Sequence, residues 1–175
     1  VTFGSYNAAQ KISDSTVRLW TQVLLAVPSS RLVLKSLSFA DDTLRARFKH
    51  RFTEAGIAAE RLEMAPPNDR EQFYAEYRHL DIALDPIPYN GGTSTTEALW
   101  QGVPVLTYAG DRWVARTSAS LLHAAGLDEW VARDEEDLVA NARALVRDLA
   151  TPARLATLRA SMRARLAASA ACDTE

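Results

Sequence analysis

The sequence predicts an α/β fold with a mostly parallel sheet and helices on both of its faces. Strand-like and helix-like segments alternate from one end of the chain to the other, an order that needs crossover connections between parallel strands. Several helix-like segments begin at capping residues, and the first carries apolar residues at helical spacing. The 175 residues, 47% hydrophobic and 24% charged, suffice for one ordinary domain with a sizeable core.

The predicted strands are short, largely apolar runs. In chain order they cover residues 1–6, 31–35, 61–64, 81–84 and 103–107. A helix is predicted after each strand, and two more follow near the end of the chain. In chain order these helices begin near Ser13 or Asp14, Asp41 or Asp42, Asp69, Thr95, Ala115, Asp134 and Thr151.

Capping chemistry and an apolar stripe set the helix boundaries. Serine and aspartate at several starts can accept hydrogen bonds from first-turn N–H groups, and Thr151-Pro152 joins a cap to a proline at the first helical position. Pro28 ends the first helix, Gly56 the second and Gly126 the fifth, and the sixth is expected to run to Leu149. The apolar stripe of the first helix is Val17, Trp20, Leu24 and Val27.

The four tryptophans are expected in two environments. Trp20 and Trp100 fall on predicted helices and are expected in the core. Trp113 and Trp130 flank predicted loops and are expected at the surface.

Charge and residue usage exclude several classes of function. A net charge of -2 gives no bulk attraction to nucleic acid or to an anionic membrane, and no membrane span or secretory signal is found. Cys172 is the single cysteine, so neither an internal disulfide nor a cysteine-based metal site is expected. His50, His79 and His123 share no ligand spacing, so no metal is expected. A cytoplasmic location is expected, and a strand at Val1 suggests a fragment of a longer protein.

Ligands of open parallel sheets bind at the carboxyl ends of the strands. Much of the polar, glycine- and proline-bearing sequence falls in the loops at that edge. These loops cover residues 7–12, 36–40, 65–70, 86–96 and 108–116.

The loop after the fourth strand carries the motif GGTSTTE. Gly91 and Gly92 allow a sharp turn and a close approach of a ligand, and the following helix offers free N–H groups and a positive dipole end to phosphate. Glu97 can accept hydrogen bonds from a ribose diol. The motif therefore predicts a diphosphate cradle, to which further donors are added by the hydroxyls of Thr93, Ser94, Thr95 and Thr96.

Structural interpretations of the same residues stay open. Ser94 and Glu97 fit a capping box, and the motif lacks the lysine of a P-loop and the spacing of a dinucleotide-binding fingerprint. Lys11 and Arg70, in two other loops of this edge, can meet a phosphate as cations, but each also fits a solvated surface side chain.

The stretch DIALDPIPYNGGTSTTEALWQGVPVLTYAGDRWVARTSASLL resembles the O-GlcNAc transferase family, above all its bacterial and SPINDLY-type members. Ser5-Tyr6-Asn7, Lys11-Ile12 and Gly126-Leu127-Asp128-Glu129 match as well. The resemblance implies a GT-B fold made of two Rossmann-like halves, with this chain as the C-terminal, donor-binding half. Residues 1–150 would form the nucleotide-sugar-binding domain, and residues 151–175 a helix and tail that pack toward the absent N-terminal half.

The resemblance also implies an activity. The family transfers a sugar from a nucleotide diphosphate to Ser or Thr hydroxyls of proteins, with inversion and without an essential metal or other cofactor. UDP-GlcNAc is the favoured donor, and a GDP-sugar is the alternative because the SPINDLY-type branch includes a fucosyltransferase. The catalytic histidine lies in the N-terminal half and upstream TPR repeats recruit the protein acceptor. No catalytic residue is therefore expected in this chain, which should be inactive alone.

Carried onto this sequence, the resemblance places Lys11 and, in the same loop, Asn7 near the diphosphate. The hydroxyls of Thr93 and Ser94 would bind the diphosphate oxygens. Glu97 would meet the ribose, and the backbone of Ala65 would meet the base.

Three positions depart from the animal members. Gly92 stands where they have a histidine, and Ala8 lies near a position where they have a glutamine. Phe73 falls where the family has a histidine near the base, so an aromatic ring would stack there instead. Two other functions remain open: a GT-B sugar-nucleotide epimerase or small-molecule glycosyltransferase, and a nucleotide-binding interaction module without catalysis.

Overall fold

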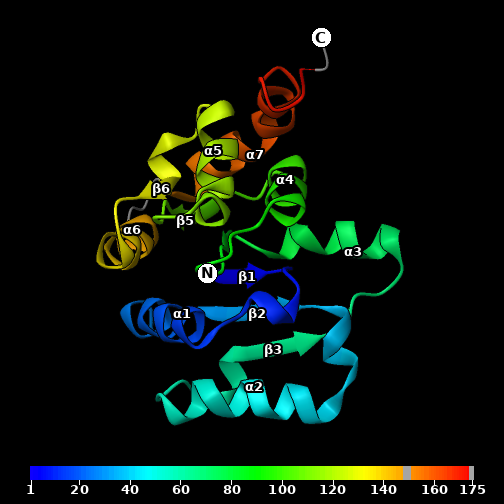
Figure 1. Cartoon of the computed structure of the whole chain (residues 1–175), viewed down its shortest axis with the longest axis vertical. Coiled ribbons are helices and arrows are strands. Elements are labelled where there is room, and N and C mark those ends of the chain that lie inside the picture. Colours follow the sequence, from blue (N-terminus) through cyan, green and yellow to red (C-terminus); the bar gives the residue numbers. More distant parts are fainter. Residues whose placement is uncertain (148–150, 174–175) are drawn as a thin grey trace.

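The computed structural model describes residues 1–147 and 151–173 (Figure 1). Within them one six-stranded sheet has the order β3-β2-β1-β4-β5-β6, and every neighbouring pair is parallel. This confirms the predicted α/β class. The strands are β1 (Thr2–Ser5), β2 (Arg31–Lys35), β3 (Leu62–Ala65), β4 (Ile82–Leu84), β5 (Val105–Tyr108) and β6 (Val131–Ala132).

Seven α-helices alternate with or follow these strands in the described residues. They are α1 (Asp14–Ala26), α2 (Asp42–Glu54), α3 (Arg70–Glu76), α4 (Thr93–Trp100), α5 (Thr117–Ala124), α6 (Glu135–Arg147) and α7 (Thr151–Ala167). All seven were expected. The predicted end of the sixth helix at Leu149 and the predicted domain boundary at 150 lie outside the described residues.

The sixth strand, β6, was not expected. It has two residues, and its pairing is Thr107↔Val131 and Tyr108↔Ala132. A run of two residues carries no periodicity. The strand forms because the residues directly after the buried Trp130 pair with the free edge of β5. β6 therefore forms the edge of the sheet next to β5.

Capping side chains begin four of the helices as predicted. Ser13 accepts from the N–H of Thr16 at 3.1 Å, and Asp69 accepts from the N–H of Gln72 at 2.9 Å. Asp41 and Asp134 act in the same way at the starts of α2 and α6. Each bond satisfies a first-turn donor that has no partner within the helix.

Helices cover both faces of the sheet, as expected. Right-handed crossovers place α1 and α2 on one face, while the return of the chain to β4 puts α4 and α5 on the other. α6 packs against α1, and α7 packs against α4, so the last two helices are divided between the faces (Figure 1).

Two of the four tryptophans lie where the sequence did not place them. Trp20 is buried and Trp113 is 74% exposed, as predicted. Trp100 is 40% exposed, because it ends α4 at the surface, where the Arg163 guanidinium lies 5.2 Å from its ring centre. Trp130 is 1% exposed, because it sits in a one-turn helix that leads into β6.

α7 contributes side chains to the core of the described chain. Met162 and Leu166 are fully buried, and Gly102 lies so close to α7 that a Cβ there would be 3.0 Å from the carbonyl oxygen of Arg159. A packing of residues 151–175 toward a second half of the protein stays a prediction.

Candidate functional site

β1 and β4 lie side by side, and the order in which the chain adds strands to the sheet reverses between them. The chain builds outward from β1 through β2 and β3, then returns to add β4, β5 and β6 on the other side. In such sheets the carboxyl ends of the two strands flank a crevice where ligands bind. The loop after β1 holds Lys11 and the loop after β4 holds Gly91 and Gly92, so the structure brings the two predicted loops to this point.

Lys11 reaches from its own loop to the loop after β4. Its ammonium donates a hydrogen bond to the carbonyl oxygen of Asn90 at 2.9 Å and lies 4.3 Å from the centre of the Tyr89 ring. Burial lowers the pKa of Lys11, and the carboxylate of Asp85 opposes that shift. Lys11 is therefore a partly buried cation beside the glycine loop, and not a fully solvated surface lysine.

Asp85 holds the glycine loop from within the protein. Its Oδ1 accepts from the N–H of Gly91 and its Oδ2 accepts from the hydroxyl of Thr107, both at 2.7 Å, and the residue is 2% exposed. Burial raises the pKa of Asp85 to about 6, against the effect of these two hydrogen bonds. We did not predict Asp85 as a site residue. The available signal was a lone carboxylate directly after a buried strand, in DIALD.

The two glycines of the loop differ in the space around them. A Cβ at Gly91 would lie 2.3 Å from Oγ1 of Thr95 and 2.9 Å from Oγ of Ser94, so no larger residue fits. A Cβ at Gly92 would meet only Cγ2 of Thr117, at an ordinary 3.6 Å. Neither glycine has a positive φ. The expected sharp turn is therefore not what requires glycine here; close packing at the helix start requires it at position 91.

The start of α4 is not closed by a capping box. Gly92 occupies the cap position, and no side chain accepts a hydrogen bond from the first turn. The hydroxyl of Ser94 donates to Oδ1 of Asn7 at 2.6 Å, and Oε1 of Glu97 accepts from the hydroxyl of Tyr74 at 3.0 Å. The capping interpretation of Ser94 and Glu97 is wrong, because both side chains bind partners outside the helix. The first-turn N–H groups and the positive dipole end remain available to an anion.

The four hydroxyl residues of the motif do not face the same way. Thr93 is exposed at the first position of α4. Thr95 is buried and its hydroxyl is hydrogen-bonded to that of Ser118 at 2.7 Å, while Thr96 donates to the carbonyl oxygen of Gly92 at 3.1 Å. Thr95 thus differs from the expectation of a hydroxyl donor, and only its backbone N–H belongs to the exposed helix start.

A cleft of about 540 Å³ opens beside this helix start. It lies at the carboxyl ends of β1, β2 and β3 and takes one wall from α3 and α4. Of the predicted site residues, Asn7, Arg70 and Glu97 line it. The full lining is Tyr6, Asn7, Ala8, Gln10, Lys35, Ser36, Leu37, Ser38, Pro67, Asn68, Arg70, Phe73 and Glu97.

Arg70 and Glu97 also border a second hollow, of about 330 Å³, between α3 and α4. Thr93 lies on the wall of that hollow. The guanidinium of Arg70 lies 5.8 Å from the centre of the Tyr74 ring, whose hydroxyl holds Glu97. These contacts join the start of α3 to the first turns of α4.

Ala65 ends β3 and does not belong to the cleft lining. Its carbonyl oxygen accepts from the N–H of Ser36 at 3.3 Å. The residues that follow it, Pro67 and Asn68, do line the cleft, as does the ring of Phe73. The loop after β3 therefore reaches the cleft a few residues later than predicted.

The part of the chain that the structure describes contains no cluster of three or more His, Cys, Asp or Glu side chains able to hold a metal ion. None of its helices combines the length and the apolar run that crossing a bilayer needs.

Comparison with known proteins assigns the family. The model of glycosyl transferase family 41 matches residues 1–175. A probable UDP-N-acetylglucosamine–peptide N-acetylglucosaminyltransferase SPINDLY of Solanum lycopersicum is 37% identical over 177 residues, covering 99% of this chain and 18% of that protein. A UDP-N-acetylglucosamine–peptide N-acetylglucosaminyltransferase of Caenorhabditis elegans is 27% identical over 139 residues, covering 79% of this chain and 12% of that protein.

Solved structures agree with this assignment. A mutant O-GlcNAc transferase of Thermobaculum terrenum superposes with a TM-score of 0.90 and 37% identity, covering 98% of this chain and 33% of that one. Sucrose-phosphate synthase of Thermosynechococcus elongatus, at 20% identity and a TM-score of 0.67, covers 96% of this chain and 40% of that one and shares the fold. The sheet and its helices match GT-B glycosyltransferase folds, and the chain spans about a fifth of the length of the SPINDLY relatives. The chain belongs to glycosyl transferase family 41.

Proposed function

We propose that this chain is the donor-binding domain of a protein O-glycosyltransferase and that its crevice holds the diphosphate of a nucleotide sugar. The observation that carries the proposal is the meeting of two features at the turning point of the sheet: the uncapped start of α4 and the Lys11 ammonium. Fixed N–H dipoles together with a nearby cation suit a diphosphate. Membership of family 41 supports the proposal, as do relatives named as peptide N-acetylglucosaminyltransferases.

The same groups suit the chemistry of sugar transfer. As the sugar leaves, negative charge grows on the nucleotide diphosphate. The α4 dipole and Lys11 would stabilise that charge, and Asp85 fixes the loop that carries the helix start, so little reorganisation is needed. In this proposal the acceptor hydroxyl attacks from a second Rossmann-like half, with inversion and without an essential metal.

The nucleoside would occupy the 540 Å³ cleft. Tyr74 binds Oε1 of Glu97, which leaves Oε2 to accept from the ribose diol. Phe73 presents an aromatic ring to the base, and the backbone after Ala65 lies on the same wall. UDP-GlcNAc is the favoured donor because of the names of the relatives, and a GDP-sugar is the alternative.

The proposal extends to the larger protein. Transfer would need the N-terminal half that supplies the catalytic residues, and upstream TPR repeats would bring the protein acceptor. A cytoplasmic location fits this role. The 175-residue chain alone would bind donor without transferring sugar.

Calorimetric titration of the chain with UDP, GDP and pyrophosphate tests the donor site. We expect nucleotide binding that Lys11→Ala weakens by about 1–3 kcal/mol, the range for hydrogen bonds to charged groups. Absence of binding of all three at millimolar concentration would exclude the proposed site. Unchanged affinity in Lys11→Ala would remove Lys11 from it.

Glu97→Gln separates ribose recognition from helix stability. Because Glu97 does not cap α4, we expect the variant to keep its melting temperature and its pyrophosphate affinity while losing UDP affinity. An equal loss of affinity for UDP and pyrophosphate would contradict the ribose role.

A further inference from the structure

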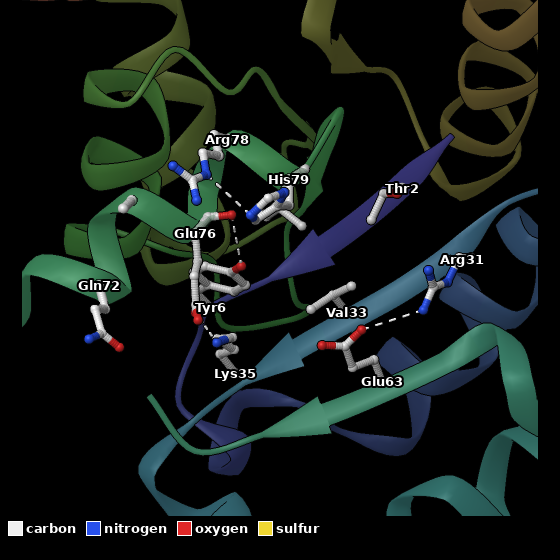
Figure 2. Close-up of a pocket in the computed structure, with 12 residues that line it drawn as sticks. Thr2, Tyr6, Arg31, Val33, Lys35, Glu63, Gln72, Glu76, Arg78 and His79 are labelled. Carbon is white, nitrogen blue, oxygen red and sulfur yellow. Dashed lines mark hydrogen bonds and ion pairs between the residues drawn. The ribbon is translucent and has the colours of Figure 1, made fainter. Parts of the chain in front are cut away.

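A second large cavity, of about 560 Å³, lies between the sheet and α3 (Figure 2). Charged side chains of β2, β3 and α3 line it, among them Arg31, Lys35, Glu63 and Glu76. Lys35 and Tyr6 line both this cavity and the nucleoside cleft. They therefore form part of the wall between the two.

Glu76 connects three segments that border the cleft, and Figure 2 shows its contacts with two of them, at Lys35 and Tyr6. Its carboxylate forms an ion pair with the ammonium of Lys35 at the end of β2. Its other oxygen accepts from Nδ2 of Asn68, in the loop after β3, at 3.0 Å. Its backbone carbonyl accepts from the hydroxyl of Tyr6, next to β1, at 3.4 Å.

Removal of either partner of this ion pair should destabilise the fold. The Lys35 side chain is only 7% exposed, so an ammonium without a partner would be buried there. Glu76 is the last residue of α3, where the helix dipole disfavours a carboxylate, and the last turn of α3 has no basic residue of its own. The pair offsets both effects, since Glu76 neutralises the buried ammonium and Lys35 neutralises the carboxylate, and this fixes the end of α3 to β2.

α3 has no fully buried residue. The hydroxyl of Tyr74 links it to Glu97 of α4. The ring centre of Phe73 lies 5.3 Å from that of Tyr6 and 5.8 Å from that of Tyr77. Arg70 and Phe73 on α3, and Asn68 just before it, face the cleft. The position of α3 therefore sets where these three residues stand.

We infer that Lys35 and Glu76 are positioning residues for nucleoside recognition: their pair holds α3 and the loop before it at the distance from β2 that gives the cleft its width. The inference rests on the proposed donor site. The diphosphate cradle is anchored separately, by the bonds of Lys11 to Asn90 and of Asp85 to Gly91, which do not pass through α3. Loss of the pair should therefore affect the nucleoside and spare the diphosphate.

The test compares UDP with pyrophosphate, by calorimetry, in Lys35→Met, Glu76→Gln and the charge-swapped double variant Lys35→Glu with Glu76→Lys. We expect each single variant to weaken UDP binding about tenfold, the scale of coupling between contacting residues, with pyrophosphate within about twofold of wild type. The swapped pair should recover most of the UDP affinity. Glu129→Gln is the matched control, because Glu129 also forms an ion pair, with Arg154, and lines neither this cavity nor the cleft.

The outcomes are distinguishable. Failure of the wild type to bind UDP overturns the proposed donor site itself. If the wild type binds, UDP affinity equal to that of the wild type in both single variants overturns the positioning role. An equal loss of UDP and pyrophosphate affinity also overturns it, as does a charge-swapped double variant that recovers no UDP affinity. If the single variants do not fold, Glu76→Asp carries the test. It keeps the charge but shortens the side chain that contacts Lys35 and Asn68, so it should lower UDP affinity and spare pyrophosphate, and unchanged UDP affinity counts against the inference.

Discussion

At the start of α4, individual atoms decide which side chains are allowed. Gly91 sits between the hydroxyls of the helix and the carboxylate of Asp85, while Gly92 has free space beside it. The two adjacent glycines therefore make a matched pair for experiment, since only one of them is sterically required.

We expect Gly91→Ala to cost about 1–3 kcal/mol of unfolding free energy, as overpacking does, and to displace the first turn that would bind diphosphate. Gly92→Ala should cost no more than about 1 kcal/mol, the loss of a glycine at a cap. Chemical denaturation and pyrophosphate titration measure both effects. Equal costs for the two substitutions would contradict the packing argument.

Asp85 makes stability depend on pH in a defined window. Its pKa in the folded chain is about 6, above the ordinary value of 3.8, so the folded chain stays protonated at this carboxyl up to a higher pH than the unfolded chain does. The contribution of Asp85 to stability therefore falls between about pH 4 and pH 6 and stays low above that.

Asp85→Asn removes this titration. The stability difference, wild type minus Asp85→Asn, should fall between pH 4 and pH 7 by about 3 kcal/mol at most, the size of a shift from 3.8 to about 6. Denaturant unfolding at the two pH values provides the measurement. A difference that does not change with pH would mean that Asp85 titrates normally.

Local sequence could predict which loops meet at the candidate site but not the contacts of all its side chains. The meeting of the glycine loop with the loop of Lys11 was predictable, because both follow parallel strands. Ser94 and Glu97 matched a local capping pattern, yet their partners Asn7 and Tyr74 are 87 and 23 residues away. Those partners exist only in the folded chain.

At the scale of elements, the strongly periodic or capped segments were predictable and the two-residue β6 was not. β6 depends on the edge of β5, and no pattern of its own indicates it. α7 shows the reverse case: its existence was predicted from Thr151-Pro152, but its burial against α4 came from tertiary packing.

If α7 is part of this core, Met162→Ala should destabilise the chain by about 2–5 kcal/mol, because Met162 is fully buried. Thr157→Ala, at an exposed position of the same helix, should leave stability unchanged or slightly improved, since alanine favours helix. Thermal unfolding of both variants tests this. A Met162→Ala loss below about 1 kcal/mol would show that α7 is peripheral.

For the whole molecule, the sheet order determines where a ligand can bind. The central pair of β1 and β4 brings two distant loops together, so that the candidate site combines a lysine from one with a helix start from the other. The class of fold and this edge were predictable from strand–helix alternation. The charged cavity under α3 was not, because it forms from side chains of three strands and a helix.

If the α4 start and Lys11 bind the diphosphate without a metal, removal of divalent cations should not matter. We expect UDP affinity in EDTA to stay within about twofold of that in excess Mg²⁺, because fixed dipoles and an ammonium supply the positive charge. Calorimetry in the two buffers provides the comparison. Binding that requires Mg²⁺ would contradict a metal-independent cradle.

The bonds across the turning point also have a kinetic meaning. Lys11 meets Asn90 and Ser94 meets Asn7 across 79 and 87 residues of chain, so neither bond can form before β1 and β4 have paired. We expect these two contacts to form after the folding barrier, because the loop-closure entropy must be lost before they are made. A nucleotide bound at this point would therefore act on the native state after the folding barrier, so it should slow unfolding and leave the refolding rate unchanged.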